Sequence, residues 1–197
     1  MIEKMLLDAE KIFGYSDKVW LAYEKHSQGM LDEVNEQMEQ LDNIHSLIGV
    51  NGLQLMRTNH ENHIHFMKNV IKYKQSDLLI HTLPWVYKTY FSKGMTPDYF
   101  VEELNQWIAA IERHIDGEPK EALISVYALM LEWHPKLVDI SGSEKILAFT
   151  AQVTWTDGHE EILNYLLTGN HRALMKRSTD MLAKGASIIE FYLEYLQ

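Results

Sequence analysis

The sequence has 197 residues, of which 46% are hydrophobic and 23% are charged, a composition typical of a folded, soluble protein rather than a disordered one. Its 28 acidic residues outnumber its 18 basic ones, and the formal charge of −10, with no basic stripe, argues against direct binding to nucleic acid. The absence of cysteine excludes disulfides, thiolate metal sites and cysteine nucleophiles.

The first predicted helix covers residues 1–13 and ends at Gly14, because its apolar residues recur on one side. Acidic residues interrupt those apolar positions, so this N-terminus does not resemble a signal peptide. No stretch of the sequence approaches the roughly 18 apolar residues that a membrane span requires. We therefore expect a cytoplasmic protein that does not insert into a membrane.

A long second helix is predicted to begin after Ser16, whose hydroxyl is suited to cap it, and to run to about Leu47. Its apolar residues fall near helical spacing: Val19, Tyr23, Met30, Val34, Met38, Leu41 and Ile48. Many polar residues separate them, which indicates a partly exposed or partner-facing helix. We expect this helix to be available for dimerisation and the protein to be a homodimer.

Glycines and prolines mark the ends of the helices that follow a break at residues 49–52. These helices are predicted at about 53–74, 76–94, 96–117 and 119–134. Ser76 and the Thr96–Pro97 pair are typical helix starts, and Pro135 is expected to lie beyond the last of these helices.

The region after residue 135 is also predicted to be mainly helical. A short helix at about 143–152 precedes a linker that contains "VTW", and three helices follow from Gly158 onward. No segment shows the alternation of strands joined by hairpin turns. The sequence therefore predicts an all-α fold.

The segment "NHENHIHF", residues 59–66, concentrates histidines on the helix predicted at 53–74. On a helix, His60 and His63 fall on the stripe that also holds Leu53, Met56, Met67 and Val70. Two imidazoles therefore take positions on an inward face where apolar side chains are usual.

Three interpretations of His60 and His63 remain open. They are buried neutral histidines that bond to neighbouring helices, since an unpaired buried polar group costs about 1–3 kcal/mol. They line a polar pocket for a cofactor or small ligand. They bind a metal together with Glu61, although no Glu-x-x-His pair recurs on a second helix as in di-iron bundles.

An aromatic helix at 76–94 strengthens the pocket interpretation. Pro84 lies inside it and is expected to kink it, which opens space between helices. Aromatic side chains at helical spacing are also common in ordinary cores. Taken with the histidines, they predict a ligand-binding set made of His60, His63, Phe66, Met67, Trp85, Tyr87 and Tyr99.

Residues 50–135 resemble the helical regions found ahead of cobalamin-binding modules in bacterial sensors, including B12-dependent photoreceptor regulators and photocobilins. The resemblance rests on His63, Phe66, Trp85, Tyr87, Gly94 and residues 98–100. It implies a globin-like or multi-helix bundle sensor domain whose ligand is a tetrapyrrole, namely a bilin, heme or cobalamin.

Residues 160–197 are similar to the opening helices of the four-helix cap that covers cobalamin. The matching residues are Leu166, Leu167, Gly169, Ala173, Leu182, Gly185, Ser187, Glu190, Tyr192 and Leu196. The sequence lacks the Asp-x-His-x-x-Gly loop that supplies the lower cobalt ligand, and two further cap helices. The resemblance therefore implies either a fragment of a longer sensor or a stand-alone relative.

These observations predict an N-terminal helix at 1–15, a helical sensor-like domain at 16–140 and a helical extension at 156–197. Because no phosphate loop, nucleophile elbow or other catalytic set occurs, we expect a non-catalytic sensory or regulatory domain with an inter-helix pocket. The alternatives are a metal-dependent helical enzyme that uses His60, His63 and Glu61, and a bundle that only binds other proteins.

Overall fold

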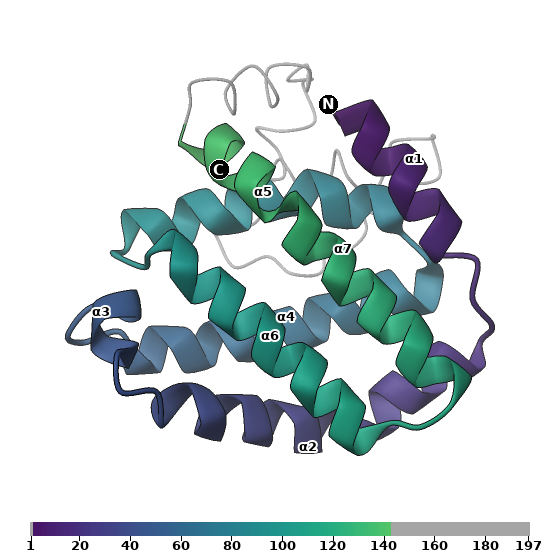
Figure 1. The fold of residues 1–197 in the computed structure, drawn as a ribbon, viewed down its shortest axis with the longest axis horizontal. Coiled ribbons are helices and arrows are strands. Elements are labelled where there is room, and N and C mark those ends of the chain that lie inside the picture. Colours follow the sequence, from purple (N-terminus) through teal and green to yellow (C-terminus); the bar gives the residue numbers. More distant parts are fainter. Residues whose placement is uncertain (1, 143–197) are drawn as a thin grey trace, which may run out of the picture. The chain divides into compact units, whose positions relative to one another are not determined.

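The computed structural model describes residues 2–142, whose backbone consists of helices joined by short turns (Figure 1). Within that range no strand occurs, which confirms the all-α prediction. The helices are α1 (Ile2–Ile12), α2 (Lys18–Glu39), α3 (Ile44–Ile48), α4 (Leu53–Tyr73), α5 (Ser76–Ser92), α6 (Pro97–His114) and α7 (Glu118–Ser141). The helices predicted from residue 143 onward, including the extension at 156–197, lie outside the described residues.

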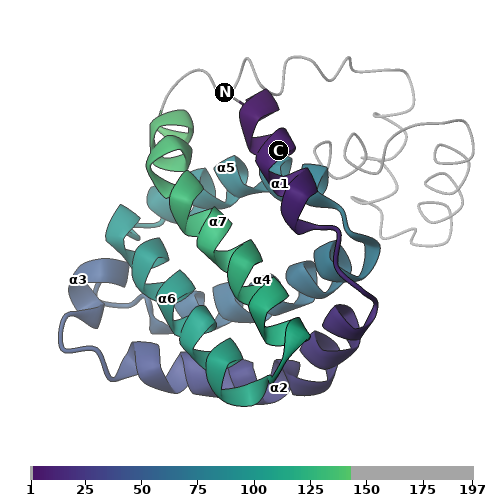
Figure 2. The ribbon, with the colours of Figure 1, turned by 45° about the vertical axis from the view of Figure 1, so that its right-hand side comes forward.

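Helices α2, α6 and α7 pack against one another, and the histidine-bearing α4 packs along α2. Helix α2 contacts α4, α6 and α7, while α6 also packs along α7. Figure 2 shows α6 and α7 next to each other in front, with α4 behind them. Helix α1 packs on α5 and α7, so it belongs to the same unit as the helices at 16–140.

Glycine and proline end and begin the helices around α6 as the sequence predicts. Gly94 and Gly117 have φ values of 94° and 68°, which a residue with a side chain rarely adopts. Thr96 is extended and precedes Pro97 at the first position of α6. The predicted boundaries of α4, α5 and α6 therefore agree with the structure to within a few residues.

The predicted second helix is shorter than expected. It ends at Glu39, not near Leu47, and its N-cap residue is Asp17 rather than Ser16. Asp42 and Asn43 follow its end and are poor helix formers, because their side chains compete for backbone hydrogen bonds. The chain turns there, and the short α3 packs against α6. The apolar face of α2 lies inside the unit, so dimerisation through this helix stays a prediction.

The last described helix is longer than predicted. We expected it to end at His134, before Pro135, but α7 continues through the proline to Ser141. A proline inside a helix removes one backbone bond and costs about 3 kcal/mol. Leu137 and Ile140, beyond the proline, are buried, and their packing offsets this cost. Pro84 likewise lies inside α5.

The core of the described unit is rich in aromatic residues that also carry polar groups. The largest fully buried side chains include Trp107, Trp133, Tyr23, Tyr87, Tyr99 and Tyr127. A buried phenol hydroxyl or indole N–H usually has a hydrogen-bond partner, but the indole N–H of Trp133 has none among the described residues. None of the helices at residues 2–142 is both long enough and apolar enough to cross a bilayer.

Candidate functional site

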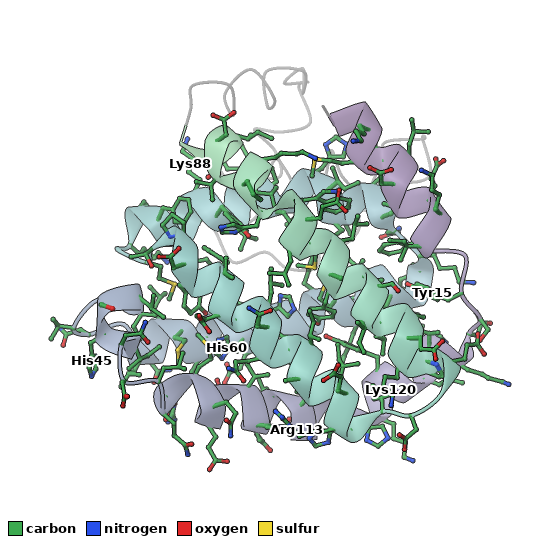
Figure 3. All side chains as sticks on the ribbon, in the orientation of Figure 1. Tyr15, His45, His60, Lys88, Arg113 and Lys120 are labelled. Carbon is green, nitrogen blue, oxygen red and sulfur yellow. The ribbon has the colours of Figure 1, made fainter. Side chains whose placement is uncertain are left out.

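His60 lies at the centre of a buried polar cluster between α4, α2 and α6. Its side chain is fully buried, and Figure 3 shows it among the helices rather than at their edge. Its Nδ1 is 2.7 Å from Asn35 Oδ1, and its Nε2 is 3.1 Å from the Tyr99 hydroxyl. Because an amide oxygen only accepts, Nδ1 donates to Asn35 and Nε2 accepts from Tyr99.

Glu103, on α6, is the acidic member of this cluster and is only 3% exposed. Its carboxylate accepts hydrogen bonds from Asn59 Nδ2 at 3.0 Å and from Trp107 Nε1 at 3.3 Å. The Asn59 amide also donates to the Tyr99 hydroxyl at 2.9 Å. His60 Nε2 lies 4.0 Å from Glu103 Oε1, which is beyond hydrogen-bond distance.

Burial dominates the electrostatics of the cluster. It raises the pKa of Glu103 to about 7, against the opposing effect of hydrogen bonds from Trp107 and Asn59. It lowers the pKa of His60 to about 3. At neutral pH His60 is therefore uncharged, and burial favours the protonated form of Glu103 more than in an exposed glutamate.

A second chain of hydrogen bonds begins at His63, one turn further along α4. His63 Nε2 is 3.0 Å from the Tyr127 hydroxyl of α7, which is 2.7 Å from the Tyr23 hydroxyl of α2. The His63 ring also stacks on Trp107, with ring centroids 5.0 Å apart. Burial lowers the pKa of His63 to about 3, so this imidazole is also neutral.

A small cavity of about 20 Å³ lies beside both chains of hydrogen bonds. Three polar residues line it: Asn59, His63 and Glu103. The rest of its lining is apolar or aromatic: Leu83, Val86, Tyr87, Phe100, Leu104, Met130 and Leu137. A cavity of this size holds about one water molecule, whereas pockets for drug-sized ligands measure about 300–1,000 Å³.

The structure brings part of the predicted ligand-binding set together. His63 and Tyr87 line the cavity, and His60 and Tyr99 belong to the polar cluster beside it. The other predicted members, Phe66, Met67 and Trp85, are not among the residues that line the cavity.

These three residues have other surroundings. Met67 is buried in the core, while Phe66 and Trp85 keep part of their surface exposed. The Lys88 ammonium lies 5.5 Å from the centroid of the Trp85 ring. The aromatic wall that the sequence predicts at this cavity is therefore formed by Tyr87 and Phe100, whose rings stack with centroids 4.0 Å apart.

Sequence reasoning missed Glu103, the acidic residue of the cluster. Its position carried a signal, because Phe100 precedes it by three residues and Trp107 follows it by four on the inward face of α6. An acid on an apolar stripe is the same kind of signal that singled out His60 and His63. The hydrogen-bonding partners Asn35, Tyr23 and Tyr127 carried no comparable local signal.

The residues proposed for a metal site do not converge. Glu61 is exposed, whereas His60 is buried and both of its ring nitrogens are hydrogen-bonded. Among residues 2–142, no group of three or more histidine, aspartate or glutamate side chains is placed to hold a metal ion.

Comparisons with protein-family models, with curated proteins and with solved structures found no match to this chain.

Proposed function

We propose that this chain is a non-catalytic sensory or regulatory protein that binds a small molecule at the cavity beside Glu103. The observation that carries the proposal is a buried carboxyl group that lines a cavity and, within residues 2–142, receives hydrogen bonds from the neutral side chains of Asn59 and Trp107. Burying an ionised carboxylate without a cation costs several kcal/mol. A ligand that donates hydrogen bonds to Glu103 offsets this cost.

The state of the histidines supports binding over catalysis. His60 uses one ring nitrogen to donate to Asn35 and the other to accept from Tyr99. A general base needs a free nitrogen within reach of the proton that it removes. His63 bonds to Tyr127, and burial holds its pKa near 3, far below the value suited to proton transfer at neutral pH.

The size of the cavity favours a small ligand over a tetrapyrrole. The resemblance to photocobilin-like sensors suggests a bilin, heme or cobalamin, each of which is many times larger than about 20 Å³. A tetrapyrrole at this position requires α4, α5, α6 and α7 to separate, because they carry the side chains that line the cavity. Binding of a few-atom ligand requires only small side-chain movements.

The test titrates the purified full-length chain with two groups of ligands. Heme, biliverdin and cobalamin are followed by absorbance, and small amines, amides and alcohols by thermal unfolding and calorimetry. We expect saturable binding of a small ligand by the wild type and by Glu112→Gln, which changes an exposed acid on α6. Glu103→Gln is expected to weaken that binding at least tenfold.

Two results contradict the proposal. One is the absence of binding by every ligand in both groups. The other is binding that stays equal in the wild type and in Glu103→Gln, since the ligand then does not depend on the buried carboxyl. A tetrapyrrole that binds and is lost in Glu103→Gln keeps the sensory role and replaces the small ligand.

A further inference from the structure

The chemistry of the same cavity narrows the class of ligand, and this inference rests on the function proposed above. The cavity measures about 20 Å³, so without rearrangement it admits an occupant about the size of a water molecule. Water, ammonium and methylammonium are close to this limit, whereas amino acids and nucleotides exceed it. The charge of Glu103 and the aromatic rings that line the cavity distinguish among these small ligands.

Glu103 lacks a cationic partner among the described residues. Its hydrogen-bond donors are an amide and an indole, and the nearby imidazole of His60 is neutral because burial disfavours its charged form. A cation in the adjacent cavity stabilises the ionised form of Glu103, which burial alone disfavours, because the attraction between opposite charges is strong in a region of low dielectric. A neutral occupant such as water supplies a hydrogen bond but no compensating charge.

The aromatic side of the cavity also favours a cation. Tyr87 and Phe100 both line it, and their rings stack nearly parallel at an angle of 10°. Stacking covers one face of each ring, so an ammonium group in the cavity is attracted only to a ring face that the stacking leaves open, and this attraction grows when the group is desolvated. Among residues 2–142, no lysine or arginine side chain lines the cavity.

The apolar lining sets an upper limit on size. Leu83, Leu104 and Met130 line the remaining walls, and close packing of a core resists occupants several atoms larger than the space it leaves. A methyl group on the ligand packs against this apolar surface, whereas a second polar group on the ligand finds few hydrogen-bond partners there.

We propose that the cavity between α4, α5, α6 and α7 binds a small ammonium cation, either ammonium or methylammonium. The Glu103 carboxylate is its anionic partner, and the Tyr87 and Phe100 rings lie on its aromatic side. Asn59 keeps the carboxylate in place through its hydrogen bond to Glu103 Oε2. Occupancy then links the concentration of the cation to the packing of the helices that line the cavity.

The experiment measures thermal unfolding and calorimetric binding of the full-length chain with chloride salts of ammonium, methylammonium, potassium and sodium at one ionic strength. Acetamide and methanol serve as neutral ligands of similar size, and butylammonium as an oversized amine. We expect saturable binding of ammonium and methylammonium alone. The variant Glu103→Gln keeps the side-chain shape and removes the charge, and is expected to weaken this binding at least tenfold, whereas Glu112→Gln leaves it unchanged.

The possible results separate the two proposals. Equal binding of acetamide or methanol overturns the cation assignment and leaves a small-molecule site. Equal effects of potassium or sodium also overturn it, because those ions donate no hydrogen bonds. If no ligand in the series binds to folded protein, as judged by circular dichroism, the cation assignment fails. The function proposed above then depends on the remaining amides, alcohols and tetrapyrroles of its own test.

Discussion

Two contacts between a histidine and a glutamate link α6 to its neighbours, and they differ in almost every physical respect. In the buried contact, His60 of α4 lies 4.0 Å from Glu103 of α6, and the two side chains are 0% and 3% exposed. In the surface contact, His114 of α6 lies 2.7 Å from Glu33 of α2, with exposures of 30% and 19%. Arg113 also pairs with Glu33, and Figure 3 shows Arg113 at the edge of the unit.

The difference shows that burial, more than the identity of the pair, decides how such side chains behave. At the buried contact, desolvation raises the pKa of Glu103 and lowers that of His60, so the uncharged forms are favoured. Neutral donors and acceptors then hold the two side chains in place. At the surface contact, Glu33 pairs with Arg113, which is always charged, and water screens the attraction.

Removing the two histidines should give the largest contrast in stability. His60→Ala removes a hydrogen-bond partner of Asn35 and of Tyr99 and opens a hole in the core, so we expect a loss of about 3 kcal/mol or more in unfolding free energy. His114→Ala should cost less than about 1 kcal/mol. Urea unfolding at pH 7 measures both values. Equal losses would show that the buried cluster contributes no more than the surface contact.

The pH dependence of stability tests the raised pKa of Glu103 at the buried contact. The pKa of Glu103 is raised from 4.5 to about 7 on folding. Its contribution to folding stability is therefore fully present below pH 4.5 and is lost as pH rises through about 7. This loss amounts to about 3 kcal/mol. We expect Glu103→Gln to gain stability relative to the wild type by about that amount between pH 4.5 and pH 8, measured by urea unfolding.

The histidines act in the opposite direction, so the variant must be compared with the wild type at each pH. Burial lowers the pKa values of His60 and His63 from 6.5 to about 3, and their contribution is lost as pH falls through that range. Both proteins share this loss, and it cancels in the difference. A difference that stays constant from pH 4.5 to pH 8 contradicts the assignment of a raised pKa to Glu103.

The hydroxyl groups of the second hydrogen-bond chain should contribute unequally. Tyr127 bonds to both His63 and Tyr23, whereas Tyr23 bonds within this chain to Tyr127 alone. We therefore expect Tyr127→Phe to cost about 2 kcal/mol and Tyr23→Phe about 1 kcal/mol. A double-mutant cycle from urea unfolding measures their coupling. Strict additivity would contradict the hydrogen bond between the two phenols.

The smallest effect is expected at the surface contact. Arg113→Gln removes the charge that pairs with Glu33 and should cost less than about 1 kcal/mol in low salt. The loss should shrink further at high ionic strength, because salt screens exposed charges. The stability difference for His60→Ala should change little with salt, since that cluster is shielded from water. Urea unfolding at low and high sodium chloride compares the two.

The helix ends that were predicted correctly depend on adjacent residues, whereas the end of α7, which was predicted wrongly, depends on contacts with distant parts of the chain. The ends of α5 and α6 depend on Gly94, Thr96 and Pro97, whose conformational preferences act within a few residues. The end of α7 depends instead on the packing of Leu137 and Ile140, which lie beyond Pro135. The sequence pattern around that proline favours a helix end, and only the contacts of the folded unit reverse it.

The candidate site was likewise predictable only where spacing along one helix identifies a residue. Helical spacing placed His60 on an inward face, and the structure confirms that it is buried. The same spacing could have identified Glu103 between Phe100 and Trp107. It could not identify the partners, because Asn35 is 25 positions from His60 and Tyr23 is 104 positions from Tyr127. Trp85 shares the helix of Tyr87 but is absent from the cavity lining.

The sequence by itself determined that the described part of the chain is helical and that polar side chains occupy the inward face of α4. Both conclusions depend on interactions between residues three or four positions apart. Only the tertiary structure decided which groups meet, which of them carry charge and how much space remains beside them. Those properties depend on distance and desolvation between residues that are remote in the chain, and no short-range pattern encodes them.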